Sequence, residues 1–382
     1  MKSLNIYISE GLADWSDDKL DKKMSKQTTK TAIKKEIIDW IMENFSRDFN
    51  QRQPVIKSRI KINHNHDGII VDYDGDLYIK YRDNTGKVME RIDYTNGIFT
   101  WGKISGHFRI SSLPIKDLSN GPEEVGGKFF CSNCNQLETL EGGPKSVGEL
   151  LLYELNSLKS LKYGPTSAKR ITIHKCAELS SLNGCPEKIS SVFECIGCPN
   201  LKTLKGIPKC EKIKIDMCGI ETLEGCPDEA HEFDIWKCKN LKSFKGGPKK
   251  TRIFKCFMSD ALKTLEGGPE KTIYMYCDHC ENLESLKGAP KEVQHFSCGG
   301  APKLTSLEGL PEDLWWLRID DCVGLNDLKC GIKHIRELSH LGMNPQFKNY
   351  IDGYIYDRNK YVYIYDDDDP IIDKLNRHHN QN

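Results

Sequence analysis

The chain has 382 residues, with 55 basic and 55 acidic side chains and a formal net charge of +0 at pH 7. This balance disfavours a dedicated nucleic-acid-binding protein, which normally carries a basic excess. No apolar run approaches the roughly 20 residues that span a bilayer, and residues 1–10 lack the apolar core of a secretory signal peptide. We therefore expect no nucleic-acid partner, no membrane insertion and no secretion by a signal peptide.

The first segment, residues 1–15, begins with the sequence MKSLNIYISEGL. This sequence resembles the short leader, of the form MKxxxxYIxE, on many phage proteins, some of which are packaged in the capsid. The resemblance implies a leader-like segment. An ordinary amphipathic first helix is the alternative interpretation, and the sequence leaves both open.

Residues 16–53 predict a polar linker followed by an amphipathic helix, since apolar side chains recur there at helical spacing. These side chains are Ile33, Ile37, Ile41 and Phe45. Residues 54–112 alternate between apolar and polar positions and contain the turn signals Asp74-Gly75 and Asn96-Gly97, which favours strands and hairpins. We expect a β-rich N-terminal cap, because the open end of a sheet requires cover.

A nearly periodic proline marks residues 113–330. The ten prolines, spaced by 19 to 22 residues, are Pro122, Pro144, Pro165, Pro186, Pro208, Pro227, Pro248, Pro269, Pro290 and Pro311. Such a period indicates stacked copies of one small unit rather than a single globular core. The sequence therefore predicts a repeat solenoid with a parallel β-sheet of about ten 21-residue repeats and mostly irregular return segments. Residues 331–382 are expected to form a C-terminal cap and an acidic, polar tail.

Each copy places apolar or cysteine residues at fixed positions. In one copy, Met275 and Cys277 are two residues apart, as in a strand with one face inward, and Cys280 follows at a tight turn. All sixteen cysteines lie within the repeats, most of them at these strand and turn positions. This pattern is typical of small buried residues rather than of disulfides, and it favours a reducing, intracellular setting.

The core pattern Met275-x-Cys277-x-x-Cys280-x-x-Leu283 resembles the leucine-rich repeat of the cysteine-containing kind. Residues 123–144 resemble more closely a group of tailed-phage repeat proteins, whose copies read SLEGGPKxVGGxFxCSxCxxLxSLEGxP. The resemblance covers about residues 105–330 and implies a leucine-rich-repeat-like fold, a phage-encoded protein and a location in the host cytoplasm or the virion. It implies little about activity, because most such proteins have no assigned function.

Three groups of residues could hold a metal ion, and the sequence offers a simpler explanation for each. The Cys-x-x-Cys pairs, normally a zinc or redox signal, coincide with repeat positions that other copies fill with Ile or Leu; these pairs are Cys131/Cys134, Cys195/Cys198 and Cys277/Cys280. Residues 72–76 fit a hairpin turn better than a calcium loop, and His64 and His66 have no visible ligand partners. We expect no metal, no cofactor and no catalytic residue.

The strand positions that alternate with the buried ones point outward and vary widely between copies. The candidate partner-binding residues on this face are Tyr153, His174, Lys214, Asp234, Trp236, Lys255, Phe257, Tyr274, Tyr276, Asp278, Trp316 and Arg318. Exposed aromatic rings mixed with charges are typical of protein-binding hot spots. Stacking of aromatic rings along a sheet is the structural alternative. On this inside–outside assignment, Cys280→Asp should unfold part of the array and Asp278→Ala should be nearly silent.

The sequence favours a non-enzymatic protein-binding module whose strand face binds a host or phage protein, with a host defence component as one candidate. The first alternative is a virion or capsid-packaged structural protein that is recruited through residues 1–15. The second alternative is an enzyme with a site in the terminal caps. The oligomeric state is left open.

Overall fold

The computed structural model describes residues 32–39, 41, 58–65, 68–78, 99–326, 332–347 and 363–365. The leader-like segment, the linker, Phe45, the Asn96-Gly97 turn and the polar tail lie outside the described residues, as do the side chains of His64 and His66.

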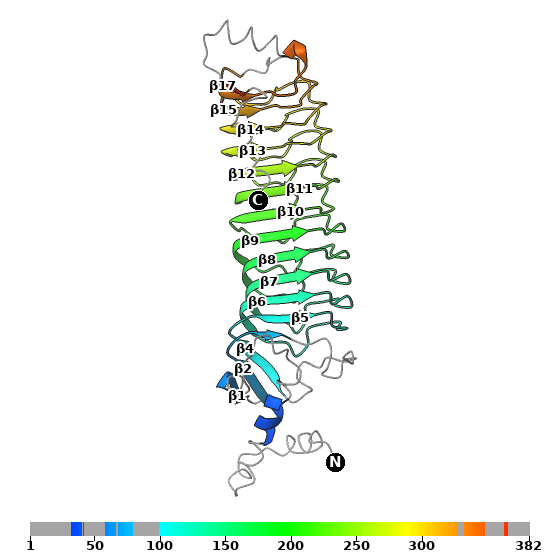
Figure 1. Cartoon of the computed structure of the whole chain (residues 1–382), viewed down its shortest axis with the longest axis vertical. Coiled ribbons are helices and arrows are strands. Elements are labelled where there is room, and N and C mark those ends of the chain that lie inside the picture. The colour runs from blue at the N-terminus through cyan, green and yellow to red at the C-terminus, as the bar shows by residue number, and fades with distance from the viewer. Residues whose placement is uncertain are drawn as a thin grey trace.

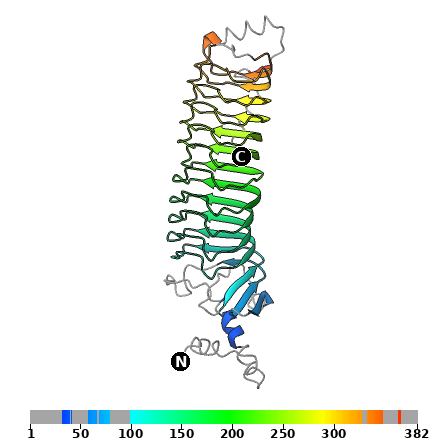
Figure 2. The same cartoon turned by 180° about the vertical axis from the view of Figure 1, so that it is seen from behind.

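A single long stack of parallel strands dominates the molecule, with the strands on one side and irregular return segments on the other (Figures 1 and 2). Its strands are β4 (Thr100–Ile104), β5 (Phe108–Ser111), β6 (Glu124–Ser132), β7 (Ser146–Tyr153), β8 (Ser167–His174), β9 (Lys188–Ile196), β10 (Lys212–Asp216), β11 (Glu229–Trp236), β12 (Lys250–Phe257), β13 (Tyr274–Tyr276), β14 (His295–Ser297), β15 (Asp313–Arg318) and β16 (His334–Ser339). About eleven turns of roughly 21 residues stack in this way, which confirms the predicted repeat solenoid.

The parallel sheet extends beyond both ends of the proline-marked region. At the N-terminal end, β2 (Gly68–Tyr73) and β3 (Leu77–Tyr78) run parallel to β4 and β5. Antiparallel pairing occurs between β1 (Ile60–Asn65) and β2. At the other end, β16 continues the register of β15, and β17 (Tyr363–Tyr365) pairs with β16. The segments on either side of residues 113–330 therefore contribute strands to the stack itself.

The predicted hairpin at Asp74-Gly75 is wrong, because β2 and β3 run in the same direction and the chain only bends between them. The aspartates of this segment hold the next coil in place. The carboxylate of Asp72 accepts a hydrogen bond from the Lys103 N–H at 2.8 Å, and that of Asp76 accepts one from the His107 N–H at 2.7 Å. These bonds fix the register of the bent strands.

The helix of residues 32–39 lies at the N-terminal end of the stack (Figure 1). Its side chains Ile37 and Ile38 are buried, as is Ile41, in the same core as the first strands. The predicted apolar helix face is confirmed for its described residues.

The interior consists of straight columns of identical positions from successive coils. Phe233 stacks on Phe254 with ring centroids 5.7 Å apart, and both are fully buried. At the tight turn, the Cys238 thiol donates a weak hydrogen bond to the Trp236 carbonyl at 3.6 Å, and Ser259 makes the same contact one coil later. Cysteine therefore serves as a small buried donor, and all fifteen cysteines in the described part of the chain are free thiols.

Many of the charged side chains form ion pairs between neighbouring coils. Lys242 lies 2.8 Å from Glu221, and Lys263 lies 3.0 Å from Glu284, in both cases 21 residues away. In these pairs, a charge on one coil faces the opposite charge on a neighbouring coil. Among the described residues, no helix is long and apolar enough to cross a membrane.

Candidate binding surface

Side chains on the outward face of the sheet are less exposed to solvent than the alternating pattern of the sequence predicts. Of the twelve candidate residues, Asp234, Phe257 and Asp278 are buried, with exposed fractions of 8%, 6% and 3%; the expectation that they are exposed is wrong. The other nine are half-buried. The reason is the spacing of about 4.8 Å between strands, because each outward side chain is covered by its counterparts on the adjacent coils.

The C-terminal half of this face carries a continuous run of aromatic rings, which we call the aromatic track. It consists of Trp236, Phe257, Tyr276, Tyr274, His295, Trp316 and Trp315. Ring centroids are 4.9 Å apart for Trp236 and Phe257, and 4.6 Å apart for Tyr274 and His295. Five predicted residues are thus brought together, and each ring is held by the next one.

Two residues of the track were missing from the sequence-based set. His295 pairs in register with Tyr274 on one side and with Trp316 on the other, so the 21-residue period contained the signal that would have found it. The 21-residue period contained no such signal for Trp315. This residue is exposed beside Trp316, and the N–H groups of both residues donate to the Gln294 carbonyl, at 2.9 and 3.1 Å.

Trp315 is the most accessible ring of the track, with 49% of its surface exposed. The guanidinium of Arg336 lies 4.7 Å above its ring, which is a favourable cation–π contact. Burial raises the pKa of Tyr276 to about 12, with smaller contributions from Tyr274 and Asp278. Its phenol is therefore neutral at physiological pH, and this end of the track offers rings with polar edges.

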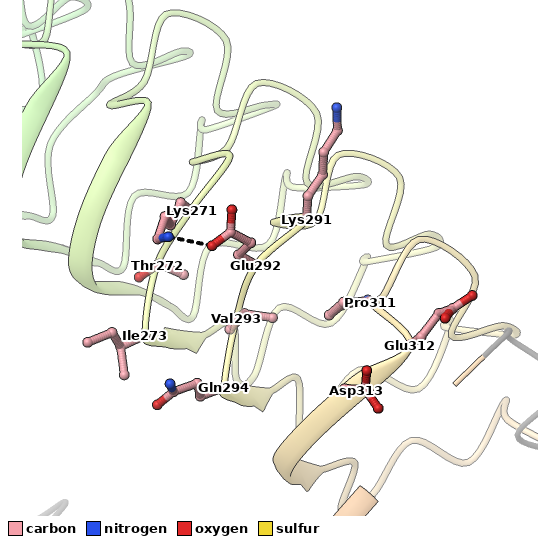
Figure 3. A pocket seen from close by; sticks show the side chains of 10 residues that line it. All are labelled: Lys271, Thr272, Ile273, Lys291, Glu292, Val293, Gln294, Pro311, Glu312 and Asp313. Carbon is pink, nitrogen blue, oxygen red and sulfur yellow. Dashed lines mark ion pairs between the residues drawn. The ribbon is translucent and has the colours of Figure 1, made fainter. Parts of the chain in front are cut away.

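A hollow of about 400 Å³ lies where the strands β13, β14 and β15 begin, next to the aromatic track. Figure 3 shows the ion pair between Lys271 and Glu292 on the same side as Ile273 and Gln294, with Pro311 and the acidic residues after it on the opposite side. The lining combines the charged side chains of Lys271, Lys291, Glu292, Glu312 and Asp313 with the apolar side chains of Ile273, Val293 and Pro311. The hollow is a mixed polar and apolar recess.

A second, smaller group of rings lies near the N-terminal end of the stack. The Tyr153 ring lies 5.2 Å from Phe130 and 5.4 Å from His174, and the Arg109 guanidinium lies 4.6 Å above Phe130. The structure thus divides the predicted aromatic residues into two groups on the same face.

Charged side chains separate the two groups of rings. Lys214 lies 3.3 Å from Glu194, and Glu232 contacts both Lys212 and Lys255, at 3.1 and 3.0 Å. Burial opposes ionisation of Glu232, but the hydrogen bonds from the two lysines outweigh it and lower its pKa. The predicted Lys214 and Lys255 are therefore engaged with neighbouring coils.

The predicted residues Asp278 and Arg318 belong to a buried polar network. Asp278 accepts hydrogen bonds from the Ser297 hydroxyl and from the Gly299 N–H. Two coils later, Arg318 donates to Asp320 at 2.6 Å, and Asp320 also accepts from the Ser339 hydroxyl. The expectation that Asp278→Ala is nearly silent is therefore wrong, because its carboxylate satisfies buried donors.

Comparisons of the chain with protein-family models, with curated proteins and with solved structures find no match in any of the three.

Proposed function

We propose that the chain is a non-enzymatic protein-binding module and that its partner docks on the aromatic track. The observation that carries this proposal is the composition of the track, since six of its seven rings are Trp, Tyr or Phe side chains and the seventh, His295, connects Trp315 to the others. Trp and Tyr are the residues most enriched at binding hot spots. Trp315, exposed beside the recess of β13 to β15, is the proposed main anchor.

The rigidity of the track supports the proposal. Its rings stand on strands that pair in register from β11 to β15, not on a loop. A partner would therefore meet side chains whose rotamers are already restricted by their neighbours, and less conformational entropy is lost on binding. The charged side chains between the two groups of rings are less available to a partner, because these lysines and carboxylates pair with each other.

The track also suits a partner with polar groups at its periphery. Arg318 and Arg336 lie near Trp316 and Trp315 as cations, and Glu337 pairs in register with Trp316. An apolar centre with a charged rim is the usual arrangement of a protein interface. The resemblance to tailed-phage repeat proteins supports a host or phage protein as the partner.

The test compares two ring-deletion variants of the same face. The track variant carries Tyr274→Ala, Trp315→Ala and Trp316→Ala, and the control carries Phe130→Ala and Tyr153→Ala from the N-terminal ring group. Both are used as bait in lysates of host and infected cells after circular dichroism has shown that they fold. We expect one partner that the wild type and the control retain and the track variant loses. Equal retention by the track variant would contradict the proposal.

A further inference from the structure

Three cysteines meet in the interior of the stack between β9 and the coil that follows it. The sulfur atoms of Cys195, Cys198 and Cys218 all lie within 4.8 Å of one another, and all three side chains are buried. Cys195 and Cys198 belong to one coil, whereas Cys218 occupies the tight turn of the next coil. The structure thus adds a third thiol to a pair that the sequence had explained by the repeat alone.

Among the described residues, these are the three thiols whose sulfur atoms all lie this close to one another. The other two Cys-x-x-Cys pairs are followed, at the turn of the next coil, by Leu155 and Ala301, neither of which can bind a metal. On the preceding coil, the turn residue Cys176 interacts with the thiol of Cys198, so a fourth sulfur lies next to one member of the group. The remaining pairs therefore serve as internal controls that lack a thiol at the turn of the next coil.

The geometry matches the requirements of a thiolate metal site. Zinc–sulfur bonds are about 2.3 Å long, so two thiolates of a tetrahedral site are about 3.8 Å apart. The sulfur atoms of Cys195 and Cys218 are 3.7 Å apart. The hydrogen bonds that metal binding would replace are weak, for example that of the Cys218 thiol to the Asp216 carbonyl at 3.3 Å. Little hydrogen-bond energy is therefore lost when a metal ion replaces these thiol protons.

We propose that Cys195, Cys198 and Cys218 bind a thiophilic d¹⁰ metal ion, zinc(II), which links two consecutive coils. Soft sulfur ligands select zinc and similar ions over magnesium or calcium. Each bound thiol releases its proton to solvent as it becomes a thiolate, so the affinity rises with pH. Because the site is buried, the ion enters as the chain folds, and its binding free energy adds to folding.

The test uses cobalt(II) as a spectroscopic probe for zinc. The full chain is unfolded and refolded without oxygen in the presence of cobalt(II), and thiolate-to-cobalt charge-transfer absorption is recorded. The wild type should retain one cobalt per chain, zinc should displace it, and zinc should raise the thermal midpoint. Cys218→Ser should lose the absorption and the zinc-dependent rise. The matched control Cys280→Ser should keep both, because serine stands naturally at this turn position in Ser259.

A second variant separates the loss of a metal ligand from the effects of misfolding. Cys195→Ile places in the column the residue that adjacent coils carry there, Ile173 and Ile215, so the core stays filled while one ligand is removed. It should fold and fail to bind cobalt. A wild-type chain that refolds without retaining cobalt or zinc would overturn the proposal. So would variants Cys218→Ser and Cys195→Ile that bind as much metal as the wild type.

Discussion

The carboxylate of Asp278 accepts a hydrogen bond from the backbone N–H of Gly299, one coil further along the stack, at a distance of 2.7 Å. The arrangement recurs between Asp320 and the N–H of Leu341, at 2.8 Å. In both cases a side chain on the outward face bonds to the backbone of the next coil. Outward orientation in this sheet therefore does not imply exposure to solvent.

Asp278→Ala should destabilise the fold by about 1–3 kcal/mol, because it leaves the buried Gly299 N–H and the Ser297 hydroxyl without their acceptor. The measurement is chemical denaturation of both proteins. The matched control is Asp313→Ala, whose carboxylate is 73% exposed and whose loss should change stability by less than about 0.5 kcal/mol. Equal effects of the two substitutions would show that the network around Asp278 does not stabilise the stack.

Tyr163 offers a stabilising substitution. It has a φ of 66°, at a turn position that glycine occupies in neighbouring coils, as in Gly184 with a φ of 88°. A side chain in this left-handed region costs about 1 kcal/mol relative to glycine. Tyr163→Gly should therefore raise the denaturation midpoint.

Gly184→Ala should have the opposite effect. A Cβ atom there would lie 2.3 Å from the Leu161 carbonyl oxygen and 2.5 Å from the Cα atom of Lys162, both of which are backbone atoms that cannot move aside cheaply. We expect a loss of more than about 1 kcal/mol, measured by the same denaturation. If both variants shifted stability in the same direction, the left-handed turn would not be the cause.

Two acidic residues, Asp234 and Glu232, should affect the pH dependence of stability with opposite signs. Burial raises the pKa of Asp234 above its ordinary value of 3.8, despite the nearby Lys255, Lys212 and Lys214. Its contribution to stability is thus present below about pH 3.8 and lost as the pH rises through the raised value. Asp234→Asn should therefore gain stability over the wild type as the pH increases in this window.

Glu232 has a lowered pKa, so its contribution is present above its ordinary value of 4.5 and lost as the pH falls through the lowered value. Glu232→Gln should be less stable than the wild type at neutral pH, and the difference should shrink in acid. Denaturation curves from about pH 3 to pH 7 measure both variants. Parallel pH profiles of the two variants would contradict the assignment.

The inward half of each coil could be predicted from the sequence, because its positions repeat with nearly the same residues. Met275, Cys277 and Cys280 are all fully buried, as their spacing indicates. The burial of the outward half could not be predicted from the sequence, because the exposure of Phe257 depends on the size of its neighbours one coil away. The two N–H groups of Trp315 and Trp316 share the Gln294 carbonyl, as those of Gln294 and His295 share the Ile273 carbonyl one coil earlier, but the aromatic side chain of Trp315 has no counterpart at Gln294. The third thiol of the cysteine cluster was visible only once coils were stacked in register.

The most direct test of the central proposal is the affinity of the purified, captured partner for the wild type and for the track variant with Tyr274, Trp315 and Trp316 replaced by alanine. Loss of hot-spot rings costs about 2 kcal/mol or more, which corresponds to about a thirtyfold weaker Kd. We therefore expect at least this loss for the track variant and an unchanged Kd for the control with Phe130 and Tyr153 replaced. An unchanged Kd for a folded track variant would show that the partner binds elsewhere and would contradict the proposed function.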